Sequence, residues 1–310
     1  MARLHRTPLW DAWYRRKIEG KIAALGPVPR IVYLESTNAC NAKCIFCPRD
    51  EMERKQGFMS EELSSRIFDQ CADWGVPEIR LHNFGETTLD RKFVDRVRDA
   101  KKKGIPKVGL YTNASKLTPD LSEKLIEAGL DAVWISVDGV TKESYERIRV
   151  GLSFEELERN AFGLVEARRR LGAKHPFVTI TMTYTPETAA EAPLLAERYG
   201  RAFDKVTAGP AHAWTYQHGS PEPVTRYACP YLWTALYILW DGRASICCED
   251  FDGREILGDA TRQTLREIWE GEPYRKARRI HHEGRFEELP ICQACPVIAN
   301  SFDRWLWWAP

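Results

Sequence analysis

The sequence predicts an α/β protein, a partial (βα)6 TIM barrel followed by a small C-terminal module of a β-hairpin and a helix. Three observations predict this class. Strand-like and helical runs alternate six times between residues 31 and 209, which requires a parallel sheet with helices outside it. The alternation ends near residue 212, where a hairpin pattern begins. Most of the nine cysteines fall into two groups, one in each part.

The predicted strands are short runs rich in β-branched and aromatic residues. They are residues 31–37, 78–84, 107–113, 131–139, 177–185 and 204–209. The segments between them are amphipathic, and several, such as 60–75, open with Ser or Thr and close with Gly, as helices do. Six units are two fewer than a complete barrel needs. We therefore expect an incomplete barrel whose active site lies at the carboxyl ends of the strands.

The chain divides into three parts by pattern. Residues 1–28 predict a helical N-terminal extension, residues 29–211 the barrel, and residues 212–310 the C-terminal module. The extension interleaves aromatic and basic residues and lacks the apolar core of a secretory signal. In the module, Asp241 and Gly242 separate two apolar runs, and this dipeptide predicts a two-residue hairpin turn.

Composition excludes several partners. Lys and Arg number 45 against 44 Asp and Glu, for a net charge of +1, so no bulk field attracts nucleic acid or an anionic membrane. The longest apolar run, residues 232–240, is about half of the roughly 20 residues that span a bilayer. We expect a cytoplasmic protein, where thiols stay reduced and cysteine clusters indicate metal.

The first cysteine group follows the first strand. The run CNAKCIFC supplies Cys40, Cys44 and Cys47, which can hold three irons of a [4Fe–4S] cube and leave the fourth open. A zinc site is the alternative. The motif resembles that of the radical S-adenosylmethionine (SAM) enzymes, C-x3-C-x2-C after the first strand of a partial barrel. The resemblance implies that SAM binds the open iron and is cleaved reductively to methionine and a 5′-deoxyadenosyl radical.

The resemblance continues at later strand ends and implies a set of SAM contacts. The run FGETTLD resembles the Gly-Gly-Glu segment of the family, with Phe84 in place of its first glycine. Gly85 and Glu86 are therefore expected at the SAM ammonium group. The other expected contacts are Ser136 and Asp138 at the ribose, Arg149 at the carboxylate, Phe46 at the adenine, and Met182 and Thr183 near the base.

The second cysteine group lies in the C-terminal module. Cys229, Cys247, Cys292 and Cys295 would saturate a cube. They resemble the twitch module, a shortened SPASM domain that holds one auxiliary cluster, with a spacing close to that of a butirosin-type aminocyclitol dehydrogenase. A structural zinc site with four cysteine ligands is the alternative. The resemblance thus implies two [4Fe–4S] clusters and SAM as cofactors.

Two cysteines are left over. Cys71 lies within a helical pattern and is expected to be buried. Neighbouring side chains of a strand point to opposite faces, so Cys248 is expected to face away from the auxiliary cluster. Epimerases of the family, including one of neomycin-type aminoglycoside biosynthesis, use a cysteine as hydrogen-atom donor. We therefore expect Cys248 to serve an epimerase, with dehydrogenation of a carbinol to a ketone as the alternative.

A small molecule is the expected substrate, because only about 30 residues precede the first strand. Peptide-modifying relatives often carry a leader-binding domain there, and a ribosomal peptide is the second alternative. The resemblance to aminoglycoside-biosynthesis members implies an aminosugar or aminocyclitol. Two sets of residues are candidate substrate contacts. The first is His212, Trp214 and Tyr216, which would stack on a sugar ring or, alternatively, pack in a linker. The second is Glu35, Glu249 and Asp250, which would pair with ammonium groups or, alternatively, build a solvated turn. An external donor of the flavodoxin or ferredoxin type is expected to supply electrons.

Overall fold

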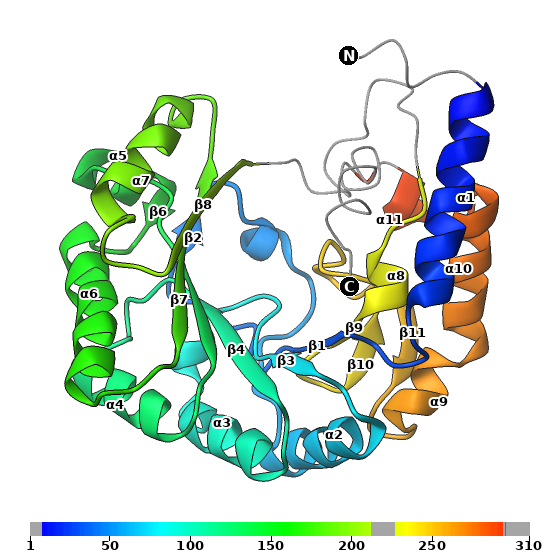
Figure 1. Cartoon of the computed structure of the whole chain (residues 1–310), viewed down its shortest axis with the longest axis horizontal. Helices are drawn as coiled ribbons and strands as arrows, with labels where there is room; N and C mark the ends of the chain where they lie inside the picture. Colours follow the sequence, from blue (N-terminus) through cyan, green and yellow to red (C-terminus); the bar gives the residue numbers. More distant parts are fainter. Residues whose placement is uncertain (1–7, 212–226, 294, 296–310) are drawn as a thin grey trace.

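The computed structural model describes residues 8–211, 227–293 and 295. Its main feature is a nine-stranded, mostly parallel sheet with the order β11-β10-β9-β1-β3-β4-β5-β7-β8. The sheet curves into an open arc with helices along its outer side (Figure 1). The expected α/β class and partial barrel are therefore confirmed.

The six predicted barrel strands all form. They are β1 (Ile31–Leu34), β3 (Glu78–Arg80), β4 (Lys107–Thr112), β5 (Ala132–Ser136), β7 (Phe177–Tyr184) and β8 (Lys205–Pro210). Each pairs in parallel with the next in this order. The first two strands end several residues before the predicted bounds, because the chain turns there into loops that build the site.

Eleven α-helices and four 3-10 turns occur in the described ranges. The helices are α1 (Pro8–Ala24), α2 (Glu61–Trp74), α3 (Phe93–Lys102), α4 (Pro119–Glu127), α5 (Lys142–Ile148), α6 (Phe154–Arg170), α7 (Ala192–Tyr199), α8 (Tyr231–Thr234), α9 (Leu265–Trp269), α10 (Glu272–Glu283) and α11 (Pro290–Gln293), and the turns are Pro48–Glu51, Thr87–Leu89, Ala189–Glu191 and Phe286–Glu288. The expected caps form at α2, where the Ser60 hydroxyl accepts from the Leu63 amide and Gly75 takes the left-handed conformation. None of the helices in these ranges is long and apolar enough to cross a bilayer.

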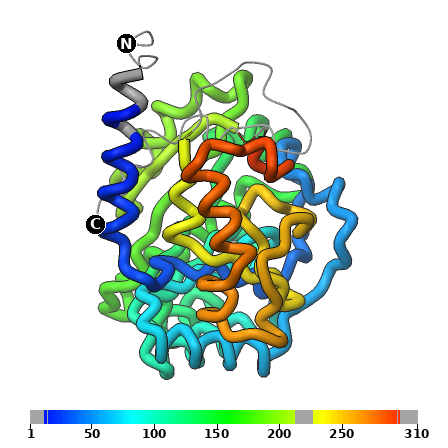
Figure 2. The backbone as a smooth tube through the Cα atoms, turned by 90° about the vertical axis from the view of Figure 1, so that its right-hand side faces the viewer, coloured from blue at the N-terminus to red at the C-terminus, as the bar shows by residue number. Residues whose placement is uncertain are grey.

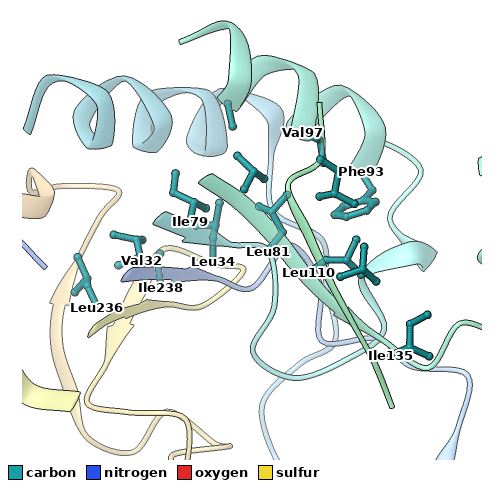
Figure 3. Packing of buried hydrophobic residues seen from close by; sticks show 14 of the residues in the cluster. Val32, Leu34, Ile79, Leu81, Phe93, Val97, Leu110, Ile135, Leu236 and Ile238 are labelled. Atoms are coloured by element: carbon teal, nitrogen blue, oxygen red, sulfur yellow. The ribbon is translucent and has the colours of Figure 1, made fainter. Parts of the chain in front are cut away.

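Alternation along the strands separates the core from the barrel interior. Val32, Leu34, Ile79, Leu81, Leu110 and Ile135 are fully buried and form one cluster with apolar residues of the outer helices (Figure 3). Burying each such side chain contributes about 1.5–3 kcal/mol. The residues between them point to the other face, where Tyr33, Arg80, Tyr111 and Trp134 line the barrel interior.

The C-terminal module continues the barrel sheet. Strand β9 (Ala235–Ile238) pairs in parallel with β1, and β10 (Arg243–Ser245) pairs antiparallel with β9 and with β11 (Ile256–Asp259). The hairpin turn lies at the predicted place but has three residues, 240–242, and not the expected two, because Leu239 pairs with Arg243. Gly242 ends this turn with φ of +92°. Helix α10 of this module lies beside α1 (Figure 2), where the His282 ring is 3.4 Å from Glu19. The barrel and the module thus share one sheet.

Candidate active site

A cavity opens at the carboxyl ends of the barrel strands. It encloses about 760 Å³, a volume that includes open solvent at its mouth. It is lined by Cys40, Cys44, Phe46, Cys47, Arg49, His82, Asn83, Phe84, Gly85, Glu86, Tyr111, Thr112, Asn113, Ser136 and Arg149. The three thiols of the first group therefore share one cavity with most of the expected SAM contacts.

Backbone pairing fixes the cysteine loop. The short strand β2 (Lys43–Cys44) pairs antiparallel with β6 (Arg149–Val150), which places Cys44 opposite Arg149. The Cys47 amide donates to the Cys44 carbonyl at 2.9 Å. Burial, partly offset by a backbone hydrogen bond, raises the pKa of Cys47 to about 11. A thiolate at this place needs positive charge nearby, which a bound iron would supply.

Gly85 lies where only a glycine fits. Its φ is +85°, and a Cβ atom there would lie 2.5 Å from the Thr37 carbonyl oxygen and 2.8 Å from that of Ala39. The Phe84 side chain in front of it is buried and meets Phe251 edge to face, with ring centroids 6.4 Å apart. The loop after β3 is therefore pressed against the start of the cysteine loop.

The Glu86 carboxylate is held by neighbouring strand ends. It accepts hydrogen bonds from the Thr112 hydroxyl at 2.6 Å, the Asn113 amide at 2.7 Å and the Thr88 hydroxyl at 2.6 Å. The side chain is buried but still borders the cavity. Its negative charge therefore stands in a fixed position on the cavity wall.

Asp138 and Arg149 form a buried ion pair. Arg149 donates through Nε and Nη2 to Asp138 Oδ2 at 2.6 and 2.5 Å, and the Thr183 amide donates to Oδ1 at 2.7 Å. Burial raises the pKa of Asp138, although Arg149 opposes this. Arg149 borders the cavity together with Ser136. Asp138 therefore orients Arg149. From the sequence we expected separate contacts with SAM for these two residues, Asp138 at the ribose and Arg149 at the carboxylate, and no contact between them.

Sequence reasoning missed two polar residues at the end of β3. His82 Nδ1 and both amide atoms of Asn83 are buried, and none has a hydrogen-bond partner within the described residues. Both residues line the cavity. Buried polar atoms without partners are costly in a folded protein, so these atoms fit contacts with a bound polar ligand.

The other expected contacts lie in different surroundings. Phe46 lines the cavity, whereas Met182 belongs to the hydrophobic core and neither Met182 nor Thr183 borders the cavity. Glu35 is fully buried and paired with Arg54. His212, Trp214 and Tyr216 lie outside the described residues.

The acidic run after the hairpin is also buried, not a solvated face. Asp250 accepts from the Ser245 hydroxyl at 2.8 Å and from the Arg254 and Glu255 amides at 2.8 and 3.0 Å. Glu249 beside it is 5% exposed. The run therefore shapes the turn that follows β10.

The four cysteines of the second group come together. Cys247 lies within electrostatic reach of Cys292 and Cys295, and Cys292 lies within reach of Cys229 and Cys295. No three His, Cys, Asp or Glu side chains in the described ranges stand close enough to hold one metal ion.

The position of Cys248 corrects the sequence argument. Strand β10 ends at Ser245, and both adjacent cysteines lie in the turn beyond it, so strand alternation does not separate them. Burial raises the pKa of Cys248, and a hydrogen bond from the Tyr237 hydroxyl opposes this. The Cys248 thiol is within electrostatic reach of Cys229 and Cys295. It is also within reach of Tyr33 and Tyr111 of the barrel.

Comparison with known families agrees with this geometry. The Radical SAM superfamily matches residues 34–198, more than half of the chain, and the iron-sulfur cluster-binding SPASM domain matches residues 229–296. The chain belongs to the radical SAM superfamily. It is a radical SAM enzyme that uses a [4Fe–4S] cluster and SAM and carries a further iron–sulfur cluster in its C-terminal domain.

Two curated relatives are named for activities other than epimerisation or carbinol dehydrogenation. A tungsten-containing aldehyde ferredoxin oxidoreductase cofactor-modifying protein of Pyrococcus furiosus is 30% identical over 54% of this chain and 47% of its own. A probable GTP 3′,8-cyclase of Methanopyrus kandleri is 30% identical over 56% of this chain and 54% of its own. The chain thus spans about half the length of these relatives.

Solved structures share the fold at low identity. BtrN in complex with AdoMet and 2-DOIA has a TM-score of 0.59 at 17% identity, covering 87% of this chain and 93% of that one. Streptococcus suis SuiB bound to the precursor peptide SuiA has a TM-score of 0.61 at 16% identity, covering 85% and 70%. These values establish a common architecture.

Proposed function

We propose that this enzyme epimerises a carbon of an aminoglycoside or aminosugar-type small molecule, with Cys248 as the hydrogen-atom donor. Cys40, Cys44 and Cys47 would hold the SAM cluster, and Cys229, Cys247, Cys292 and Cys295 the auxiliary cluster. We place the barrel at residues 29–211 and the auxiliary domain at 212–310. The SAM cluster with bound SAM supplies a 5′-deoxyadenosyl radical that removes a hydrogen atom from the substrate.

The observation that carries the proposal is the environment of Cys248. Its thiol meets the Tyr237 hydroxyl, and the Tyr237 ring stacks on Tyr33 of β1 with centroids 4.7 Å apart. Tyr111, which also lies within electrostatic reach of Cys248, lines the cavity. Burial raises the pKa of Cys248, in the direction that favours the protonated thiol that a hydrogen-atom donor needs.

The hydrogen balance of the step is simple. The substrate radical takes the hydrogen atom of the Cys248 S–H bond on the face opposite to abstraction, which inverts the carbon and leaves a thiyl radical. One electron from an external low-potential donor and one proton from solvent restore the thiol. Tyr237 holds the sulfur in place throughout.

The proposed roles of the cavity residues follow from their placement. Arg149, fixed by Asp138, would pair with the SAM carboxylate, and the fixed charge of Glu86 suits the SAM ammonium group. Phe46 would cover the adenine. His82 and Asn83 offer both donors and acceptors, which suits the hydroxyl and amino groups of an aminosugar.

Two alternatives take the same radical to different products. In dehydrogenation, the substrate radical loses a proton and an electron to give a ketone, and BtrN, whose crystal structure is a complex with AdoMet and 2-DOIA, supports a small-molecule ligand on this fold. In peptide modification, the substrate would be a ribosomal peptide. SuiB bound to its precursor peptide supports that alternative.

Turnover in heavy water distinguishes epimerisation from dehydrogenation. The enzyme is incubated with SAM, dithionite and a panel of aminoglycosides and aminocyclitols, and products are read by mass spectrometry. We expect one deuterium in an epimerised product. Cys248→Ala should abolish the epimer while 5′-deoxyadenosine still forms. A ketone without solvent deuterium would overturn the proposal.

The second spare cysteine is the matched control for this experiment. Cys71 is fully buried in the core and does not line the cavity, so Cys71→Ala removes a thiol that does not border the proposed site. We expect this variant to keep both the epimer and its deuterium label. If Cys71→Ala lost the deuterium label and Cys248→Ala kept it, the hydrogen-atom donor would be Cys71 and not Cys248.

A further inference from the structure

His281 connects two cysteines of the auxiliary group. It lies on α10, is 2% exposed, and packs edge to face on Phe286 with ring centroids 5.0 Å apart. Its Nδ1 is 3.2 Å from the Cys229 backbone nitrogen, and its Nε2 is 3.2 Å from Cys292 Sγ. Neither the motif nor the family resemblance assigns this histidine a role.

The two contacts determine the tautomer of the ring. A backbone N–H can only donate, so Nδ1 must be the acceptor and carry no hydrogen. The single N–H of the neutral ring is therefore at Nε2. It points at Cys292 Sγ, so the sulfur is the acceptor of this hydrogen bond.

We propose that His281 is a positioning residue that raises the reduction potential of the auxiliary cluster by donating an Nε2–H···S hydrogen bond to Cys292. The inference rests on the proposed assignment of Cys292 as a cluster ligand. Hydrogen bonds to the ligating sulfurs are among the factors that set the potential of iron–sulfur clusters. The bond strengthens as the sulfur gains negative charge, so it stabilises the reduced cluster more than the oxidised one.

Removing the donor should make the auxiliary cluster harder to reduce. At a fixed solution potential, we expect the ratio of oxidised to reduced cluster to increase about tenfold. For a one-electron couple, this corresponds to a reduction potential about 59 mV more negative. A higher potential suits a cluster that accepts electrons. The dehydrogenation alternative requires that property, so the same contact bears on the choice between the two reactions.

Two substitutions separate the donor from the backbone contact. In His281→Asn the side-chain oxygen takes the place of Nδ1 at the Cys229 amide, but no group reaches Cys292. In His281→Gln the amide nitrogen takes the place of Nε2. Both are made in the full chain with Cys40, Cys44 and Cys47 replaced by alanine, so that an electron paramagnetic resonance titration reads the auxiliary cluster alone. We expect the lower potential in His281→Asn and a nearly unchanged one in His281→Gln.

Equal potentials in His281→Asn and the parent, at equal iron content, would overturn the inference. Should His281→Asn lose iron, the parent protein decides: histidine labelled with nitrogen-15 must give a weak coupling to the reduced cluster, with an exchangeable proton. No coupling, or the strong coupling of a directly ligating nitrogen, overturns the inference. Failure of the ligand assignment itself is recognised separately, because Cys292→Ala in the same triple-alanine background would then keep about four irons per chain.

Discussion

Arg54 and Glu35 form a bidentate ion pair between the cysteine loop and the first strand. Arg54 Nη1 and Nη2 donate to the two oxygens of Glu35 at 2.5 and 2.7 Å, and both side chains are at most 4% exposed. Arg54 Nε also donates to the Phe251 carbonyl at 2.5 Å. One guanidinium thus ties the cysteine loop, the barrel and the C-terminal domain together.

Removal of Arg54 should therefore destabilise the whole protein. Arg54→Leu leaves the Glu35 charge buried and unpaired, which costs roughly 3–5 kcal/mol. Unfolding in urea measures this loss. The control is Lys124→Ala, which breaks an exposed pair with Asp120 and should cost less than about 1 kcal/mol. Equal losses in both variants would contradict the structural role of Arg54.

Gly85→Ala should weaken SAM binding at least about tenfold, a cost of about 1.4 kcal/mol, because the new Cβ forces the cavity loop away from Thr37. The matched control is Gly104→Ala. Gly104 has a similar φ of +87°, but no atom lies within 4 Å of the position a Cβ would take. It should lose about 1 kcal/mol of stability and bind SAM normally. Equilibrium dialysis measures SAM binding by both variants. Normal binding by Gly85→Ala would count against this SAM site.

Arg149→Met should reduce SAM affinity by about 10- to 100-fold. The reason is that it removes a charge-assisted hydrogen bond to the ligand, which contributes about 1.5–3 kcal/mol. The loss has a second source, because Asp138 is left buried without its partner. The double variant Arg149→Met with Asp138→Asn removes that penalty. Isothermal titration should show that affinity stays low in the double variant. Full recovery would mean that Arg149 serves only to neutralise Asp138.

A pH dependence is expected from Asp204, whose carboxylate accepts from the Val178 amide at 2.7 Å and pairs with Arg168. Burial raises its pKa, but these hydrogen bonds outweigh burial and lower it overall. The stability that it contributes is therefore present above about pH 4, the ordinary Asp value, and is lost as the pH falls further. Urea unfolding should show wild type losing more stability than Asp204→Asn between pH 6 and 3. If the stability of wild type and that of Asp204→Asn changed in parallel with pH, the predicted contribution of Asp204 to the pH dependence would be excluded.

The sequence pattern predicts the parallel strands and the place of the hairpin turn, because these depend on local periodicity and turn chemistry. It does not predict that β9 pairs with β1, since that contact joins residues about 200 positions apart. The same limit applies to Glu35 and Arg54, whose pairing depends on a long loop. Alternate positions of the strands do carry a signal for the barrel interior, because Arg80 stands between Ile79 and Leu81.

The assumption that Cys247 and Cys248 lie in a strand fails for a physical reason. The chain leaves the sheet after Ser245, where the buried Asp250 binds the Ser245 hydroxyl and closes a turn. Adjacent side chains in a turn do not alternate between two faces. Both thiols therefore come within reach of the same cysteine group, which local sequence does not reveal.

The most direct test of the account is the iron content of three proteins purified and reconstituted without oxygen. Wild type should hold about eight irons per chain. The variant with Cys40, Cys44 and Cys47 replaced by alanine should hold about four and fail to cleave SAM, and the variant with Cys229 and Cys292 replaced should also hold about four. About four irons and one zinc in wild type, with the zinc lost on replacement of Cys229 and Cys292, would contradict the assignment of a second cluster.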